Sequence, residues 1–162
     1  MNNESGVFNL CSRYSPLVAG VGAMLCITIL ARLDGLGASN LWLMASFGAT
    51  MVILFGLPES PLARPANIFF GHVLTTLVGL VILTLCGVQP WSLGLAVGIA
   101  VSLMLLTNTT HPPAGANPLI VMLGGQDWNF LWSPVALGAS LIIIGGVVFH
   151  RCTGRRYPVR WW

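Results

Sequence analysis

The stretch HPPAGANP, residues 111–118, decides how this chain is interpreted, because it places a titratable ring, three prolines and an asparagine in an apolar, uncharged region. Proline removes a backbone donor and disfavours a helical conformation for the residue before it, so we expect residues 111–114 to be extended. Asn117 followed by Pro118 is typical of an N-cap with proline at the first helical position. The sequence therefore predicts a short helix from Asn117 to the glycine pair at 124–125.

The composition is that of a membrane protein. Of the 162 residues, 56% are hydrophobic and 7% are charged, whereas about 25% are charged in an ordinary soluble domain. Residues 66–126 contain no Asp, Glu, Lys or Arg. We divide the chain into a short polar N-terminus (residues 1–15), a single transmembrane domain (residues 16–149) and a basic C-terminal tail (residues 150–162).

The N-terminus and the cysteines exclude several other features. The N-terminus has neither a basic lead nor an apolar core, so no signal peptide is expected. The 4 cysteines have no C-x-x-C spacing, which argues against a disulfide framework and against a zinc site. No catalytic residue, cofactor or metal ion is therefore expected.

Apolar segments separated by Gly, Pro, Asn and charged residues predict an all-α polytopic membrane protein with about six membrane segments. These segments are residues 16–31, 38–56, 66–86, 91–106, the short 111–125 and 131–149. The alternative is five full spans with residues 111–125 as a re-entrant segment. Six crossings with a cytoplasmic C-terminus place every arginine except Arg32 inside, whereas five crossings place two arginines outside. Because arginine favours the cytoplasmic side, we prefer six segments with the C-terminus in the cytoplasm.

A weak internal repeat relates the two halves of the chain. Residues 48–56 (GATMVILFG) resemble residues 115–124 (GANPLIVMLG), and their leading glycines lie 67 positions apart (115 − 48). Three segments in each half is an odd number, so the halves would cross in opposite directions, as in the inverted repeats of secondary transporters. The sequence thus predicts a 3+3 inverted repeat with two half-length helices that start at Thr50 and Asn117.

The half-length helices indicate what the interior binds. The helix from Thr50 or Asn117 to the next glycine would have about two turns and a length of roughly 10 Å. This is well short of the ~30 Å thickness of the hydrocarbon core. Both helices would start near the midplane and direct free N–H groups and partial positive charge into one cavity, which suits a small anion. Thr50 and Asn117 can donate hydrogen bonds, and Gly48 and Gly115 allow close approach to the backbone. The alternative is that the glycines serve only close helix packing.

The chain resembles the HPP family of integral membrane proteins, which is named for the His-Pro-Pro found here at residues 111–113. The resemblance extends to SFGAT (46–50), PESPLARPAN (58–67), GH (71–72) and MLLT (104–107), and it covers most of residues 17–149. Relatives in plastids and cyanobacteria are associated with nitrite transport, so the resemblance implies nitrite as the anion. With the helix starts, it gives these candidate substrate-binding residues: Gly48, Ala49, Thr50, His111, Pro112, Pro113, Gly115, Ala116 and Asn117.

Two histidines lie in or beside the predicted spans, where an ionisable side chain is costly and marks a functional candidate. His72 lies about six residues into the third segment, roughly 9–10 Å deep, and could carry a proton alongside an anion. His111 lies at the mouth of the broken segment, where it could attract or gate the anion. For each, the alternative is a structural hydrogen bond to a carbonyl of a neighbouring helix. His150 is assigned to the basic tail, which we expect to bind anionic lipid.

Residues 59–65 connect the second and third segments and contain too many prolines for an α-helix. Glu59 and Arg64 could pair across this turn, a contact worth about 0–1 kcal/mol when exposed. We expect a solvated loop. The alternative is a loop that dips toward the cavity and places Ser60 and Asn67 at its entrance.

These features predict a passive or proton-coupled transporter or channel for a small monovalent anion. The alternative is a non-transporting membrane scaffold or accessory subunit, whose glycines pack helices and whose basic tail recruits a partner. An enzyme is not expected, because the spans contain no H-E-x-x-H, no G-x-S-x-G and no paired carboxylates. We expect a homo-oligomer in the bacterial inner (plasma) membrane, with lipids and no nucleic acid among its partners.

Overall fold

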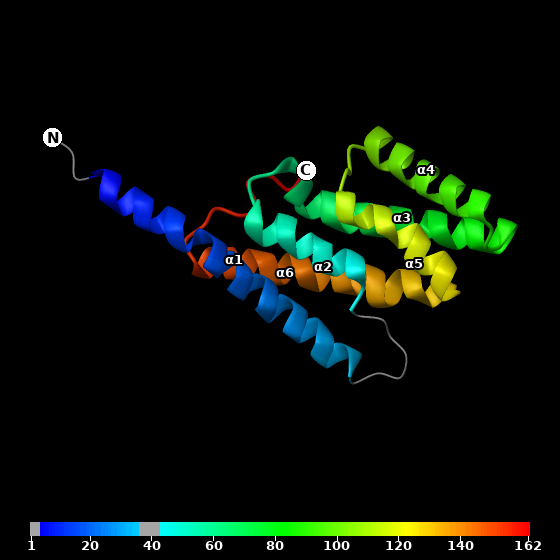
Figure 1. The fold of residues 1–162 in the computed structure, drawn as a ribbon, viewed down its shortest axis with the longest axis horizontal. Coiled ribbons are helices and arrows are strands. Elements are labelled where there is room, and N and C mark those ends of the chain that lie inside the picture. The colour runs from blue at the N-terminus through cyan, green and yellow to red at the C-terminus, as the bar shows by residue number, and fades with distance from the viewer. Residues whose placement is uncertain (1–3, 36–42) are drawn as a thin grey trace.

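The computed structural model describes residues 4–35 and 43–162, with side chains from residue 16 onward in those ranges. This part of the chain forms six α-helices joined by loops and by 3-10 and π-helical turns, and it contains no strand (Figure 1). The helices are α1 (Glu4–Asp34), α2 (Ala45–Met51), α3 (Pro65–Cys86), α4 (Pro90–Leu106), α5 (Asn117–Gly124) and α6 (Leu137–Cys152). The prediction of an all-α fold is confirmed.

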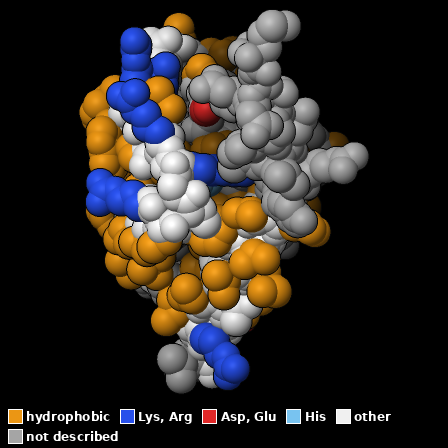
Figure 2. All heavy atoms as spheres, turned by 90° about the vertical axis from the view of Figure 1, so that its left-hand side faces the viewer, with side chains coloured by type: hydrophobic (Ala, Val, Ile, Leu, Met, Phe, Trp, Pro, Cys, Tyr) orange, Lys and Arg blue, Asp and Glu red, His pale blue; other side chains and the backbone are white. Residues whose placement is uncertain are grey.

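Three helical segments are long and apolar enough to cross a membrane. They are Pro16–Asp34, Pro65–Cys86 and Trp128–Cys152, with 19, 22 and 25 residues, which meets the ~20 residues that a hydrocarbon core requires. In the last of them, η4 (Trp128–Leu131) and η5 (Trp132–Ala136) precede α6. Apolar side chains cover the flanks of the molecule in Figure 2, as expected for helices that face lipid.

Two segments are much shorter than a membrane is thick. α2 continues into η1 (Val52–Gly56), and the combined segment Ala45–Gly56 is about 18 Å long at 1.5 Å per residue. α5 has 8 residues, about 12 Å, and follows the 3-10 turn η3 (Pro112–Ala116). Because the hydrocarbon core is ~30 Å thick, neither helix crosses it alone.

The predicted start of the first short helix is wrong. Thr50 lies in the middle of Ala45–Gly56, because α2 begins directly after Met44. Met44 makes no side-chain hydrogen bond to the first turn. The sequence therefore carries no polar capping residue at this start, and polar capping residues are the signal by which helix starts are usually found.

The start of the second short helix is predicted correctly, but for a different reason. Asn117 is the first residue of α5, whereas Ala116 occupies the N-cap position and the Asn117 side chain does not cap the helix. The extended stretch expected for residues 111–114 is confined to His111 (φ −135°, ψ 96°), because Pro112–Ala116 form the 3-10 turn. Proline suits the first turn of a helix, so the two prolines start η3 instead of preventing it.

Glycines with positive φ terminate two helices where the sequence predicted ends. Gly125 has φ 58° and ψ 38° directly after α5, and Gly87 has φ 64° directly after α3. Residues with a Cβ atom rarely adopt such angles, so glycine is the usual residue at this position. α3 consequently turns back at once into α4, and the two helices pack side by side (Figure 1).

α3 lies at the centre of the fold and contacts α4, α5 and α6. Two glycines of α3 allow η3 and α5 to pack closely against it. A Cβ atom at Gly71 would lie 2.9 Å from the Cβ of His111, and one at Gly79 would lie 2.8 Å from the Cα of Pro118. Such distances are shorter than packed carbon atoms tolerate, so neither position accepts a side chain without displacing its neighbour.

α6 uses two glycines in the same way against the first short helix. A Cβ atom at Gly138 would lie 2.5 Å from the Phe47 ring, and one at Gly146 would lie 2.8 Å from a Leu54 methyl carbon. α1 packs on η1 and α6. Each short helix therefore lies against the glycine face of one long helix.

Candidate functional site

Four polar side chains from separate segments meet inside the bundle. Thr50 of α2, His72 of α3, His111 before η3 and Asn117 of α5 are all 0% exposed. The Thr50 Oγ1 atom lies 3.1 Å from His72 Nε2 and 2.9 Å from His111 Nε2. The Nδ2 atom of Asn117 lies 3.0 Å from His72 Nδ1. We call these four side chains the polar cluster.

The amide of Asn117 determines which nitrogen of His72 carries the hydrogen. Its NH₂ group donates to the His72 carbonyl at 3.1 Å and to Thr76 Oγ1 at 3.0 Å. An amide oxygen in that place would face the carbonyl oxygen, so the NH₂ group must point this way. The same two hydrogens also face His72 Nδ1 at 3.0 Å, so they are shared among three acceptors and this nitrogen carries no hydrogen. The neutral His72 ring then carries its hydrogen on Nε2 and donates it to Thr50.

A loop carbonyl determines the tautomer of the second histidine. His111 Nδ1 lies 2.8 Å from the Leu62 oxygen. A carbonyl oxygen only accepts, so Nδ1 carries the hydrogen and the Nε2 of the neutral ring is an acceptor. Thr50 therefore accepts from His72 and can donate to His111.

The Thr50 hydroxyl has a second acceptor within reach. Its Oγ1 atom lies 2.9 Å from the Ser46 carbonyl oxygen one turn earlier in α2. If His111 gains a proton, its Nε2–H can donate to Thr50 while the Thr50 hydroxyl turns to Ser46. The polar cluster thus keeps its hydrogen bonds in both protonation states of His111, as a proton-accepting site must.

The surroundings of the polar cluster are apolar and uncharged. The Phe47 ring packs edge-on against His72, with ring centroids 5.0 Å apart, and Ala114 is fully buried beside Gly71. Residues 66–126, which supply three of the four cluster side chains, contain no Asp, Glu, Lys or Arg. Charge brought to this place can therefore be compensated only by the histidines and by oriented dipoles.

The loop between α2 and α3 reaches the polar cluster, so the expectation of a fully solvated loop is wrong and the alternative describes it better. The turn η2 (Pro61–Ala63) directs the Leu62 carbonyl at His111, and Ala63 is 0% exposed. Asn67 is buried and donates to the Thr110 carbonyl at 2.9 Å. Loop prolines make these contacts possible because they preset a tight turn.

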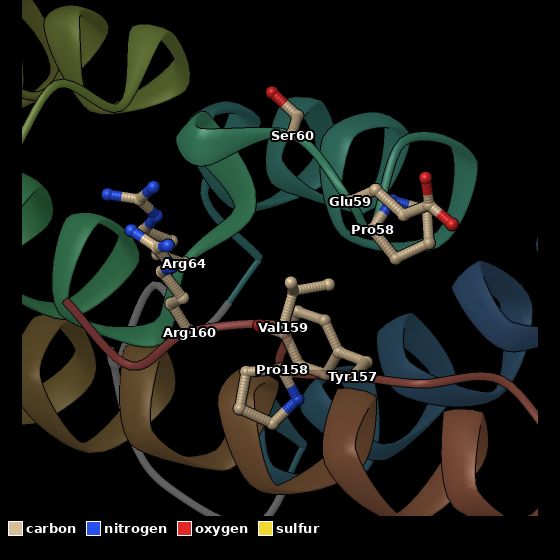
Figure 3. A pocket seen from close by; sticks show the side chains of 8 residues that line it. All are labelled: Pro58, Glu59, Ser60, Arg64, Tyr157, Pro158, Val159 and Arg160. Carbon is tan, nitrogen blue, oxygen red and sulfur yellow. The ribbon is translucent and has the colours of Figure 1, made fainter.

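The predicted ion pair in this loop is not formed. Figure 3 shows the Glu59 and Arg64 side chains pointing to opposite sides of the loop. Glu59 is exposed and Arg64 is half-buried. Ser60 instead uses its hydroxyl oxygen to accept from the Leu62 N–H at 3.2 Å, a local contact that fixes the turn.

The structure brings together three of the predicted substrate-binding residues, Thr50, His111 and Asn117, and adds His72 to them. The other candidates lie apart from the polar cluster's hydrogen bonds. They are the exposed Gly48, Ala49 and Pro112, the half-buried Gly115 and Ala116, and the buried Pro113. Gly48 lies on the face of α2 turned toward α1, where it lines an apolar groove with residues such as Gly20 and Met24.

Sequence reasoning missed two contributors to the polar cluster. Thr76 lies one turn after His72 on the same face of α3, a spacing that could have revealed it. Ser46 contributes its carbonyl, and its hydroxyl is buried without a partner, as is Asn117 Oδ1. A backbone acceptor such as Ser46 or Leu62 leaves no signal in the side-chain pattern.

The assignment of His150 to the basic tail is wrong. His150 lies in the last turn of α6, is 0% exposed and has its Nε2 atom 2.9 Å from the Leu54 carbonyl oxygen. It therefore binds a free carbonyl near the C-terminal end of η1, where such groups lack helical partners. His150 was assigned to the tail because arginines follow it in the sequence.

Apolar helices of membrane-spanning length around a buried polar cluster define a polytopic helical membrane protein. The transmembrane region that characterises the HPP family matches residues 10–158. The chain belongs to the HPP family, and the resemblance of its motifs is confirmed. This match includes all four members of the polar cluster.

Two curated relatives are transmembrane proteins of Dictyostelium discoideum. One is 34% identical over 154 residues, which is 90% of this chain and 54% of the relative. The other is 37% identical over 132 residues, 76% of this chain and 42% of the relative. The chain thus spans about half the length of these relatives or less. No solved structure matches the chain, and the bacterial inner membrane stays a prediction because both relatives are eukaryotic.

Proposed function

We propose that this protein moves a small monovalent anion, nitrite in the first instance, across a membrane together with a proton. The observation that carries the proposal is the Thr50 hydroxyl, which joins the Nε2 atoms of His72 and His111 at 3.1 and 2.9 Å in a fully buried place. This arrangement offers hydrogen-bond donors without a fixed positive charge. A lone anion is costly to bury, but an anion that meets a protonated imidazole forms a pair with no net charge.

The internal contacts support the inverted repeat as part of this proposal. At the same offset of 67 positions that relates Gly48 to Gly115, Gly71 corresponds to Gly138 and Gly79 to Gly146. The contacts correspond as well. Gly79 lies against Val121 of α5, and Gly146 lies against Leu54 of η1, which is the residue 67 positions before Val121. Reciprocal contacts of this kind are expected of two halves related by a pseudo-two-fold axis.

The two short helices also run in opposite directions in Figure 1, α2 toward the left and α5 toward the right. Thr50 and Asn117, which are equivalent in the repeat, both belong to the cluster. We therefore place the anion between the two halves, as in other inverted-repeat transporters. The Asn117 N–H already donates to the Ala114 carbonyl of η3, and Pro118 has no N–H, so the donors offered here are the cluster side chains.

Anion passage requires the cluster to open. Its four side chains are fully buried and bonded to one another, so the structure represents a closed state of the proposed path. We propose that the path leaves at the α2–α3 loop, whose Leu62 carbonyl accepts from His111. We propose that this side faces the cytoplasm, because the loop and the arginine-rich tail lie at the same end of the molecule (Figure 1).

The closed cluster also favours a second candidate, a non-transporting scaffold or accessory subunit. In that case the hydrogen bonds serve only to hold four segments together, as buried polar networks often do. We propose a homo-oligomer in either case. α4 turns Gly94 and Gly98 outward with open space beside them, and small residues four apart allow close helix contacts in membranes.

Nitrite uptake into proteoliposomes tests the proposal. Thr50→Val removes the hydroxyl that joins the histidines and keeps the side-chain shape, so uptake should fall by about tenfold or more, the factor for a lost hydrogen bond to a charged group. Thr50→Ser should retain uptake. The matched control is Thr84→Val, since Thr84 bonds only to the Leu80 carbonyl of its own helix at 2.8 Å.

An imposed proton gradient completes this experiment. With the wild-type chain, an acidic outer solution should accelerate inward nitrite movement, and Thr50→Val should abolish the acceleration. Equal uptake by Thr50→Val, Thr84→Val and wild type at equal insertion would contradict the proposal that nitrite passes through the polar cluster. A wild-type chain that moves neither nitrite nor protons and co-purifies with one fixed protein would favour the scaffold.

A further inference from the structure

Residues 155–162 of the C-terminal tail form a strap across the start of α3. The Tyr157 hydroxyl donates to the Ala63 carbonyl at 2.8 Å, and the Trp161 carbonyl accepts from the Ala66 N–H at 3.1 Å. The Trp162 ring stacks on Phe70 with centroids 5.4 Å apart and an angle of 27° between the planes. The tail is thus held by the loop and by the first turn of α3.

Next to the strap lies an apolar groove of about 310 Å³ between α3 and α6. Its floor and walls are apolar rings and aliphatic side chains. The lining residues include Phe69, Phe70, Ile143, Ile144, Trp161 and Trp162. The polar Ser140 at its edge already donates to the Ala136 carbonyl at 2.8 Å. The groove therefore offers mainly apolar contact, which suits a hydrocarbon chain.

Two arginines stand at the strap end of this groove. Arg64 directly precedes Pro65, and Arg160 directly precedes Trp161, and both Pro65 and Trp161 line the groove. Arg64 and Arg160 also line one small pocket between loop and tail, of about 70 Å³. In Figure 3 both guanidinium groups lie on the side away from Glu59. Neither makes an ion pair within the described residues.

We propose that this place is a binding site for one anionic phospholipid, whose phosphate lies between Arg64 and Arg160 and whose acyl chain fills the groove under Trp161 and Trp162. Guanidinium groups bind phosphate oxygens in a bidentate manner. Indole rings prefer the headgroup layer, so the tryptophans mark the depth at which phosphate and acyl chain separate. The proposal does not depend on anion transport.

The site differs from a general attraction between basic tail and membrane. Arg151 and Arg156 are exposed and carry the same charge, but neither lines the small pocket between loop and tail that Arg64 and Arg160 line. A general attraction would treat all these arginines alike, since it depends on charge and distance only. A site would distinguish Arg64 and Arg160 from the other two.

Fluorescence quenching of the full-length protein in detergent tests the proposal, with phosphatidylglycerol brominated on its acyl chain as the probe. Wild type should bind this lipid more tightly than brominated phosphatidylcholine. Arg64→Gln with Arg160→Gln should weaken binding about 25-fold, at roughly fivefold for each arginine. Arg151→Gln with Arg156→Gln is the control with the same change of charge and should weaken it by less than about threefold.

Three results would overturn the proposal. Equal losses in the two double variants would show general electrostatic attraction. Full competition by inorganic phosphate, with no preference for a lipid chain, would show a free anion site. If the variant with both Arg64→Gln and Arg160→Gln does not fold, Ile144→Phe provides the test. Ile144 is 59% exposed, and a phenylalanine there fills the groove from outside without adding a tryptophan that bromine would quench, so unchanged quenching in this variant would exclude the acyl-chain position.

Discussion

The two halves of the molecule share a framework and differ at its centre. In the first half, η1 lies against Gly146 of α6, and in the second half α5 lies against Gly79 of α3. The histidines do not follow this pattern. The residue 67 positions after His72 is Ala139, and the residue 67 positions before His111 is Met44. Packing is thus equivalent in the proposed halves, whereas neither histidine has a histidine at its equivalent position.

This difference separates two kinds of constraint. The glycines serve close approach, which both halves need if each short helix is to lie within the bundle. The histidines have no such general role, because Ala139 and Met44 are buried in equivalent places without any polar partner. We therefore expect substitutions at the glycines to change folding and substitutions at the histidines to change function.

The largest expected effect is on the function of the asymmetric centre. His72→Ala should lower nitrite uptake about ten- to hundredfold, because the Thr50 hydroxyl and the Asn117 amide lose the partner between them. Proteoliposome uptake at equal protein insertion measures this. His150→Ala is the matched control, since His150 is an equally buried histidine outside the polar cluster. Similar uptake in the two variants would contradict the separate role of His72.

A moderate effect should distinguish the two glycine faces. Gly79→Ala places a methyl group 2.8 Å from the Pro118 Cα, a backbone atom that cannot turn aside, whereas Gly146→Ala meets the flexible end of Leu54. We expect Gly79→Ala to lower the free energy of unfolding by about 1–3 kcal/mol and Gly146→Ala by less. Melting temperatures in one detergent compare them. Gly20→Ala, which has open space beside it, should change nothing, and equal effects at Gly79 and Gly20 would refute the packing argument.

The smallest expected effect concerns the strap. Tyr157→Phe removes the hydrogen bond to the Ala63 carbonyl and should cost about 1 kcal/mol. Hydrogen exchange of the Arg64 and Ala66 amides should become faster. Val159→Ala, at an exposed position of the same tail, is the control and should leave exchange unchanged.

The same tyrosine predicts a pH dependence. Burial raises the pKa of the Tyr157 hydroxyl above its usual range, near 10. A group whose folded pKa is raised stabilises the fold fully below its unfolded pKa, and the stabilisation is lost as the pH rises above that value. Wild-type tail protection should therefore fall as the pH rises above about 10, and Tyr157→Phe should show no such step. A step of equal size in the variant would assign the effect to another group.

The sequence predicted the fold best where backbone chemistry is explicit. Pro65 and Gly87 bound α3, and Asn117 and Gly125 bound α5, because proline and glycine restrict or extend the angles available to the chain. The start at Thr50 failed for the opposite reason. Met44 precedes α2 without a capping side chain, and a helix start without a polar cap cannot be recognised in the amino-acid sequence.

The candidate site was predicted in part for a similar reason. Thr50, His111 and Asn117 were found from the motifs, and their meeting with His72 follows from tertiary packing alone. The acceptors that set the direction of the hydrogen bonds are main-chain carbonyls of Ser46 and Leu62. Every residue has a carbonyl, so only the fold decides which of them points inward.

Two successive carbonyls of the α2–α3 loop face opposite sides. The Leu62 oxygen accepts from the His111 ring, and the Ala63 oxygen accepts from the Tyr157 hydroxyl of the tail. Since peptide planes are rigid, only the φ and ψ angles of Ala63 separate these two bonds. The turn η2 can therefore act as a hinge at a single residue, Ala63. A displacement of the tail at Tyr157 would then move the Leu62 carbonyl and change its hydrogen bond to the buried His111 ring.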